Sequence, residues 1–146
     1  MNNMNNINPK MWGKNGWKFM HWITLGYSDT PTNNEKTDMR NFFNSIGNVL
    51  PCLSCRQNFL KHIKKYPLGQ RELSSRSTLV EWLMNIHNEV NIITGKKLYT
   101  LDMLYNEYMN QSLIPSSWLF YLIIFIIILL ITLFIRHYSK LRQYLR

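Results

Sequence analysis

Only two of the 146 residues are cysteines, and both lie in the segment Pro51-Cys52-Leu53-Ser54-Cys55. This number excludes a framework of several disulfides and a zinc site built from two cysteine pairs. Acidic residues are also scarce, because eight Asp and Glu stand against 17 Lys and Arg, for a net charge of +9. Such an excess suits an anionic ligand or nucleic acid. Since no nucleic-acid-binding motif accompanies the charge, we expect no nucleic acid among the partners.

The sequence has no segment with the alternating apolar pattern of a strand, and no internal repeat is evident. Residues 1–9 are rich in Asn and lack the apolar run of a secretory signal peptide. We expect these nine residues to be loosely ordered. What remains predicts one small all-α domain that begins near residue 10, with an appendage after it.

Five helices are predicted in this domain, over residues 10–26, 34–48, 51–66, 78–94 and 101–108. Apolar residues recur every three or four positions in the second and fourth of them. Pro51 is placed at the first helical position, where its missing N–H leaves nothing unpaired. Thr78 and Glu81 form the predicted capping box of the fourth helix, and Gly95 ends it.

A long apolar run follows at residues 118–135, in which Thr132 is the only polar residue. As a helix it would span roughly 27 Å, about the thickness of a bilayer core. Trp118 and Tyr121 at one end and Arg136 and Tyr138 at the other are typical interfacial anchors. We therefore predict a single transmembrane helix, preceded by a linker over residues 111–117 and followed by a basic tail over residues 136–146.

The two cysteines lie three positions apart at the predicted start of a helix. The partial positive charge of a helix N-terminus favours a thiolate and lowers the pKa of a cysteine there. Such a pair can form an exchangeable disulfide, which favours a redox function.

Other functions of the pair stay open at this point. As a structural crosslink it closes a very small loop and removes little entropy from the unfolded chain. A zinc-bound, membrane-anchored interaction module could use Cys52, Cys55, His62 and His87, although their spacing matches no usual zinc pattern. A thioredoxin-like reductase needs a strand before the cysteines. A purely structural membrane protein leaves the polar face of the fourth helix unexplained.

Two more blocks accompany the cysteines. Trp17 and His21 lie four residues apart and share a helix face. The run His87-Asn88-Glu89-Val90-Asn91 borders the apolar stripe of the fourth helix, and Lys96 follows it. Together, a W-x-x-x-H helix, a C-x-x-C pair and an HNxVN helix resemble the Erv/ALR family of FAD-linked sulfhydryl oxidases over about residues 10–109. The resemblance implies an all-α four-helix bundle with a short fifth helix, and an FAD-binding domain over residues 10–110.

The resemblance also implies the residues of the site. The catalytic pair would be Cys52 and Cys55, with Cys55 next to the flavin. No metal is expected. The residues that would contact FAD are Gly13, Lys14, Trp17, His21, Tyr27, His87, Asn88, Val90, Asn91, Lys96 and Tyr99. Lys14 stands where the family often has arginine, which replaces a bidentate phosphate contact by a point charge.

The implied activity is thiol oxidation, in which a protein dithiol attacks Cys52 and its electrons pass through Cys55 and FAD to O₂, giving hydrogen peroxide. Many family members carry a second, shuttle cysteine pair, and cellular members have a structural cysteine where this chain has Met84. Without the shuttle pair and the structural cysteine, the chain resembles the minimal enzymes of large DNA viruses. It implies that a partner, thioredoxin-like or a small C-x-x-C protein, delivers the electrons. The family also implies a homodimer.

The location of the domain follows from two conflicting signals. Insertion through a C-terminal anchor leaves the domain in the cytosol, whereas the basic tail itself prefers the cytosol. We expect a single-pass protein of a virion or a host intracellular membrane, with its catalytic domain facing the cytosol.

Overall fold

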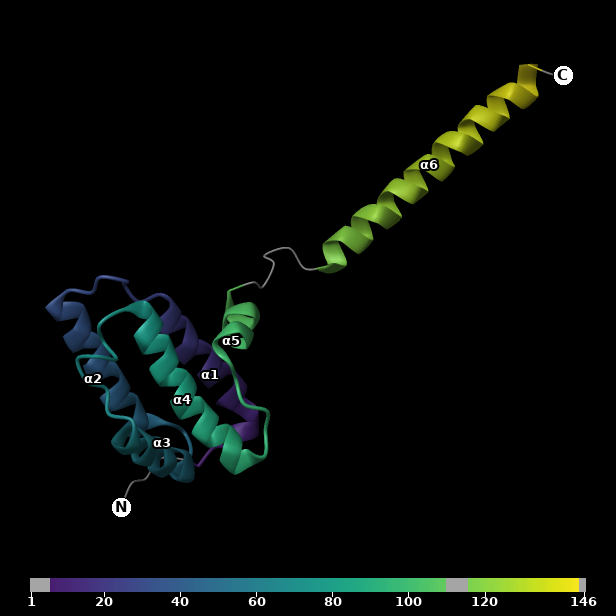
Figure 1. The fold of residues 1–146 in the computed structure, drawn as a ribbon. Coiled ribbons are helices and arrows are strands. Elements are labelled where there is room, and N and C mark those ends of the chain that lie inside the picture. Colours follow the sequence, from purple (N-terminus) through teal and green to yellow (C-terminus); the bar gives the residue numbers. More distant parts are fainter. Residues whose placement is uncertain (1–5, 110–115, 145–146) are drawn as a thin grey trace. The chain divides into compact units, whose positions relative to one another are not determined.

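The computed structural model describes residues 6–109 and 116–144. The chain divides into two compact units, residues 1–110 and residues 111–146, and each is described by itself. The described residues form helices and no strand, as predicted (Figure 1). The first unit contains α1 (Pro9–Leu25), α2 (Asn33–Val49), α3 (Leu53–Lys65), α4 (Arg76–Thr94) and α5 (Leu101–Tyr108).

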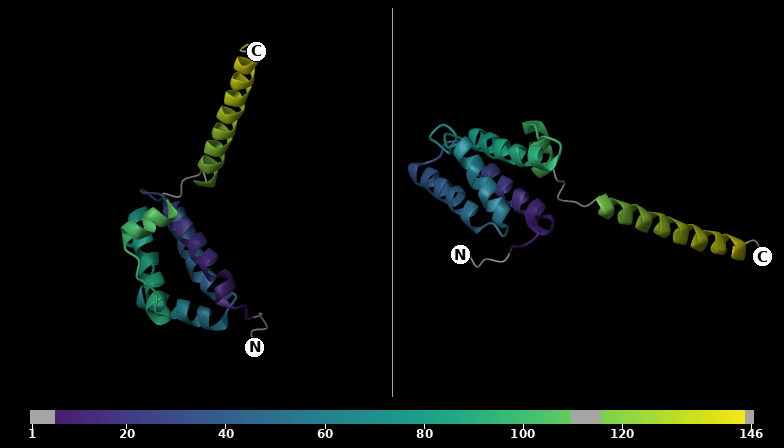
Figure 2. Two further views of the ribbon diagram at one scale, coloured as in Figure 1. Left: turned by 90° about the vertical axis from the view of Figure 1, so that its right-hand side faces the viewer. Right: turned by 90° about the horizontal axis from the view of Figure 1, so that it is seen from below.

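The helices of the first unit pack as a bundle. The long helices α1, α2 and α4 run side by side, and α3 crosses one end of them (Figures 1 and 2). Helix α4 contacts α1, α3 and α5, and α2 packs on α3. One core fills the space between α1, α2, α3 and α4, and its fully buried members are Phe43, Leu73, Leu79, Leu83 and Ile86. A second cluster joins α1, α4 and α5, and contains Leu25, Val80, Met84, Leu104 and Tyr108.

The starts of two helices differ from the prediction. Helix α3 begins at Leu53, two residues after Pro51, because the Cys52 sulfur takes the capping position and accepts the N–H of Cys55. Helix α4 begins at Arg76, because Ser75 is its cap and forms the capping box with Thr78. The predicted box of Thr78 with Glu81 is therefore wrong: Thr78 is the third residue of the helix, where it closes the box with the residue before α4.

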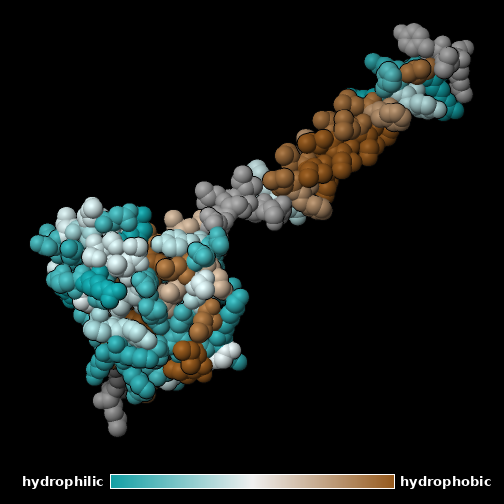
Figure 3. Space-filling model, in the orientation of Figure 1, coloured by the Kyte–Doolittle hydropathy of each residue, from teal (hydrophilic) through white to brown (hydrophobic). Residues whose placement is uncertain are grey.

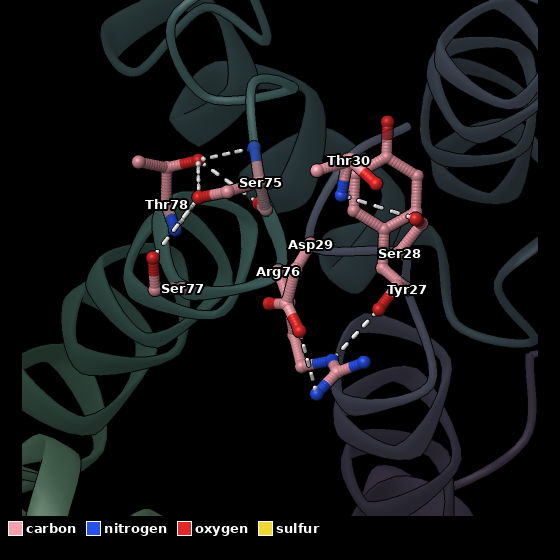
Figure 4. A network of polar contacts seen from close by, with 8 residues as sticks. All are labelled: Tyr27, Ser28, Asp29, Thr30, Ser75, Arg76, Ser77 and Thr78. Atoms are coloured by element: carbon pink, nitrogen blue, oxygen red, sulfur yellow. Dashed lines mark hydrogen bonds and ion pairs between the residues drawn. The ribbon is translucent and has the colours of Figure 1, made fainter. Parts of the chain in front are cut away.

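Arg76 ties the start of α4 to the turn after α1. Its Nε donates to the carbonyl oxygen of Tyr27 at 2.7 Å, and its Nη1 lies 3.2 Å from a carboxylate oxygen of Asp29 (Figure 4). The Tyr27 hydroxyl donates to the carbonyl oxygen of Leu73 in the loop before α4. These contacts fix the end of the bundle that lies opposite the cysteines.

Gly47 lets α2 approach α3 closely. A Cβ atom at this position would lie 3.0 Å from side-chain carbons of both Phe59 and Leu60. We expect Gly47→Ala to lower the free energy of unfolding by about 1 kcal/mol, because overpacking against Phe59 and Leu60 outweighs the gain of up to about 1 kcal/mol that alanine brings to a helix interior. Denaturant unfolding of the full chain in a neutral detergent measures the loss. Ser45→Ala, at an exposed position of the same helix, is the matched control, and equal stability of the two variants would contradict the close contact.

The second unit contains α6 (Ser116–Tyr144). Its apolar stretch, Trp118–Gln143, is long and apolar enough to cross a membrane, by length and composition. Apolar side chains cover most of α6 on the face that Figure 3 shows, and residues 118–131 and 133–135 all expose apolar side chains. Residues 116–117 of the predicted linker belong to α6, and the helix continues through the predicted basic tail as far as Tyr144. Residues 110–115 and 145–146 lie outside the described residues.

Candidate active site

Cys52 and Cys55 form a disulfide at the start of α3. The Cys52 sulfur accepts the peptide N–H of Cys55 at 3.2 Å and lies 3.2 Å from the Ser54 hydroxyl. Both sulfurs therefore lie at the positive end of a helix, which stabilises the thiolates that form when the disulfide is reduced.

The segment ahead of α1 lies over this disulfide. The peptide N–H of Ile7 donates to the Pro51 carbonyl oxygen at 2.7 Å, and the Asn6 side chain accepts the N–H of Leu53 at 3.0 Å. Cys52 is only 3% exposed. Two residues of the segment predicted to be loosely ordered are thus held against the cysteine loop, and residues 1–5 lie outside the described residues.

Cys55 lies in the wall of a cavity of about 220 Å³ between α1, α3 and α4. The lining includes Trp12, Gly13, Trp17 and Met20 from α1, Asn58 and Phe59 from α3, and Val90, Ile93 and Thr94 from α4. Pockets that enclose a whole drug-sized ligand hold roughly 300–1,000 Å³. This cavity therefore suits one flat, apolar part of a larger ligand, placed directly against a redox-active sulfur.

Aromatic rings from three helices and the loop before α5 gather beside the cavity. The Trp17 ring stacks on the His87 ring, with centroids 3.9 Å apart and planes 6° from parallel. His21 lies 5.0 Å from Tyr108, also stacked, and the His87 and Tyr99 rings are 5.0 Å apart. The fold thereby brings the W-x-x-x-H residues of α1 and the HNxVN histidine of α4 together, and Tyr108 of α5 lies beside them.

The two histidines are buried and uncharged at neutral pH. Burial lowers the pKa of His21 to about 4. Burial, followed by the charges of His21 and Lys96, lowers the pKa of His87 to about 3. Nε2 of His21 lies 2.9 Å from Nδ1 of His87, so one ring donates its single proton to the other. Nδ1 of His21 is buried without a hydrogen-bond partner among the described residues, and can serve a ligand.

Asn88 holds the loop before α5 against α4. Its amide donates to the Tyr99 carbonyl oxygen at 3.0 Å and accepts the Tyr99 N–H at 2.8 Å. Both ends of this amide are used, so Asn88 places the Tyr99 ring rather than facing the cavity. Asn91 is 3% exposed and lies 3.5 Å from the Asn88 side chain.

The remaining predicted residues divide between the site and the rest of the fold. Gly13 and Val90 line the cavity. Lys14 is exposed on α1, and Lys96 is exposed just after α4. The charge of Lys96 is the third cause of the lowered pKa of His87, following burial and the charge of His21. Tyr27 is 4% exposed and packs in the core at the other end of α1. The structure does not bring Tyr27 to this cluster.

Several cavity residues were not predicted, although their spacing points to them. Asn58 and Phe59 follow Cys55 by three and four positions, and Ile93 and Thr94 follow Val90 in the same way. Residues at these spacings share a helix face.

The zinc alternative finds no support in the described residues. Cys52 and Cys55 are joined to each other, and no group of three or more His, Cys, Asp and Glu residues is placed to hold a metal. His62 belongs to another contact, with its Nδ1 3.9 Å from Glu89.

The sequence profile of the Erv1/Alr family matches residues 14–110. The chain belongs to this family. Erv1/Alr proteins similar to it include a probable FAD-linked sulfhydryl oxidase of Acanthamoeba polyphaga mimivirus, 49% identical over 94 residues. That match covers 64% of this chain and 66% of the mimivirus protein. An FAD-linked sulfhydryl oxidase of African swine fever virus is 29% identical over 105 residues, which cover 72% of this chain and 85% of that protein.

Cellular Erv1/Alr proteins share the fold as well. The FAD-linked sulfhydryl oxidase ERV2 of Saccharomyces cerevisiae is 31% identical over 66% of this chain and 47% of its own length. The chain therefore spans about two thirds of the mimivirus relative and about half of the yeast one. The crystal structure of the yeast Erv1 core matches 77% of this chain and 92% of its own with a TM-score of 0.66, at 22% identity. The predicted helical Erv/ALR fold is confirmed.

Proposed function

We propose that this chain is an FAD-linked sulfhydryl oxidase that makes disulfides in partner proteins. The observation that carries the proposal is the disulfide at Cys55 in the wall of an apolar cavity, beside stacked aromatic rings. Membership of the Erv1/Alr family and similarity to viral FAD-linked sulfhydryl oxidases support the same function.

The residues present fit FAD. The cavity next to Cys55 suits the flat isoalloxazine ring, with Gly13, Trp17 and Val90 in its wall. The unpartnered Nδ1 of His21 and the rings of His87 and Tyr99 suit the polar, flat adenine end. Asn88 acts through Tyr99, and Asn91 lies behind it. We assign Lys14 and Lys96 to the phosphates by their charge.

The chain's own chemistry is thiol–disulfide exchange. A substrate thiolate attacks the Cys52 sulfur, the Cys52–Cys55 bond breaks, and Cys55 leaves as a thiolate. The second substrate thiolate then attacks the substrate sulfur of the mixed disulfide and releases Cys52. The substrate has gained one disulfide, the cysteine pair has gained two electrons, and the two thiol protons pass to solvent. When bound, FAD supplies the two-electron acceptor that reoxidises the pair and passes the electrons to O₂, giving hydrogen peroxide.

The fold supports each of these steps. The start of α3 stabilises the leaving thiolate of Cys55 at its third residue. Trp17, Met20 and Phe59 form an apolar wall beside Cys55, which is itself half-buried.

The partners and placement remain part of the proposal. The sequence has no third cysteine, so a protein dithiol or a C-x-x-C shuttle must attack Cys52 itself. Because Cys52 is 3% exposed, the segment of Asn6 and Ile7 must move aside for this attack. We assign residues 10–110 to the FAD-binding domain and residues 118–135 to a membrane anchor, and propose a homodimer. We place the domain on the cytosolic side of a virion or host membrane. Protease protection of the domain in sealed, oriented membranes would contradict this orientation.

A visible absorption spectrum of the full chain, purified in a neutral detergent, tests the function. We expect a flavin band that bleaches with anaerobic dithiothreitol and returns with air. A folded, colourless protein that stays without the band after FAD is added would overturn the proposal.

A further inference from the structure

The charges of the first unit are distributed unevenly around the disulfide. No Asp or Glu precedes Asp29, and none lies between Asp38 and Glu72. Helices α1 and α3 and the cysteine loop therefore carry basic residues and no acid. Glu89, the acid of α4 that reaches α3, is paired with Lys65 at 2.7 Å.

Some of these basic residues already have a role. Lys14 is assigned to the cofactor, Lys18 lies over the Trp22 ring, and Arg56 is buried with its guanidinium donating to the Leu50 carbonyl oxygen. Lys10, Lys61 and Lys64 are exposed, on the first turn of α1 and along α3.

Exposed apolar side chains lie closest to the cysteines. Leu53 is 50% exposed, Val49 is 62% exposed and Ile7 is 44% exposed. Leu53 follows Cys52 directly, Val49 ends α2 three residues before it, and Ile7 is hydrogen-bonded to Pro51. We name Ile7, Val49, Leu53, Lys10, Lys61 and Lys64 the disulfide face.

The disulfide face has the size and layout of a protein-binding surface. Lys61 and Lys64 lie roughly 14 and 18 Å from Cys52 along α3, at 1.5 Å per residue. A standard interface covers about 800 Å² on each partner and so extends about 16 Å from its centre, which includes the Lys61 position and brings Lys64 within the length of its own side chain. Apolar residues at the centre and charged residues at the rim are typical of such interfaces.

We propose that the disulfide face is the docking surface for an acidic protein substrate, whose dithiol is flanked by apolar residues and then by Asp or Glu. The inference rests on the proposed function and names its substrate class. The exchange is the one given above: the docked dithiol loses two electrons to the Cys52–Cys55 pair and leaves as a disulfide. A nucleic acid would use the lysines but leave the apolar centre without a partner, and a membrane would use both but leave the disulfide without a substrate.

Three reduced C-x-x-C peptides with the same apolar core, flanked by Glu, Gln or Lys, test the inference. The measured quantity is the rate at which each peptide reduces the Cys52–Cys55 disulfide. The full chain is kept in neutral detergent without oxygen, and the freed thiols are detected by alkylation. We expect the acidic peptide to react roughly tenfold or more faster than the basic one at low salt, as electrostatic steering gives. High salt should remove most of this difference.

The variant Lys10→Gln/Lys61→Gln/Lys64→Gln should bring the three rates together. Lys36→Gln is the matched control, because Lys36 lies in the first turn of α2, about 20 Å along that helix from Val49. This variant should keep the wild-type order of peptide rates.

Equal rates for the three peptides with the wild-type chain would overturn the inference and leave the proposed oxidase function intact. A triple variant that loses binding to anionic vesicles or to nucleic acid while the peptide order persists would also overturn it. A disulfide that neither the peptides nor dithiothreitol reduce would contradict the proposed function itself.

Discussion

Replacing Cys55 by serine is expected to abolish dithiol oxidation while FAD stays bound. The cofactor residues proposed above lie on α1, α4 and the Tyr99 loop, so the substitution removes none of them. It does remove the sulfur in the cavity wall, which is the only route from Cys52 to the cofactor in the proposed mechanism. We expect oxygen consumption with dithiothreitol to fall to the level of free FAD.

The measurement is oxygen uptake, together with the flavin absorbance of the same sample. Ser45→Ala is the matched control, because Ser45 is exposed on α2 and does not line the cavity. It should keep most of the activity. A yellow Cys55→Ser protein that still consumes oxygen with dithiothreitol would contradict the route through Cys55.

Acid is expected to destabilise the first unit strongly, beginning well above the range in which carboxylates titrate. The pKa of His21 falls to about 4 and that of His87 to about 3 on burial, against 6.5 when exposed. Below pH 6.5 the unfolded chain therefore binds protons that the folded chain does not, so stability falls as the pH falls. By pH 4 the two histidines together cost on the order of 6 kcal/mol, at 1.36 kcal/mol per pKa unit. That loss is comparable with the whole stability of many domains.

Denaturant unfolding of the full chain between pH 7 and pH 5 measures this effect. In that window the carboxylates stay ionised in both states, so the slope reports mainly the histidines. We expect His21→Asn and His87→Asn each to flatten the slope. His62 contributes in the same direction, because burial lowers its pKa more than Glu89 raises it. A double variant with the wild-type slope would contradict the protonation states assigned here.

Spacing along helices made much of the architecture predictable. Trp17 and His21, and likewise His87 and Asn91, are each placed by one turn of one helix, so their relative positions follow from the sequence. The packing of α1, α3 and α4 around one cavity depends on tertiary structure, which spacing within a helix does not show, so only the family resemblance predicted it. The apolar run of α6 was equally clear, because its composition alone sets it apart.

The errors arose where one side chain had two possible partners. Thr78 can pair forward with Glu81 or backward with Ser75, and the extended backbone of Ser75 decides for the second. The Cys52 sulfur was expected inside a helical turn, but it serves as the cap and so shifts the start of α3. Asn88 binds the Tyr99 backbone through both ends of its amide, a contact that spacing did not indicate, and its contact with FAD stays a prediction. Sequence spacing shows which residues share a face but not which of several neighbours a polar group will choose.

The contact of Asn6 and Ile7 with the cysteine loop has a practical consequence. An affinity tag or a reporter protein joined ahead of residue 1 begins only a few residues from the route that a substrate takes to Cys52. Such a fusion would slow large substrates while leaving dithiothreitol unaffected, and this pattern could be mistaken for substrate selectivity. Tags for kinetic work on this enzyme belong after α6, or should be removed before protein substrates are compared.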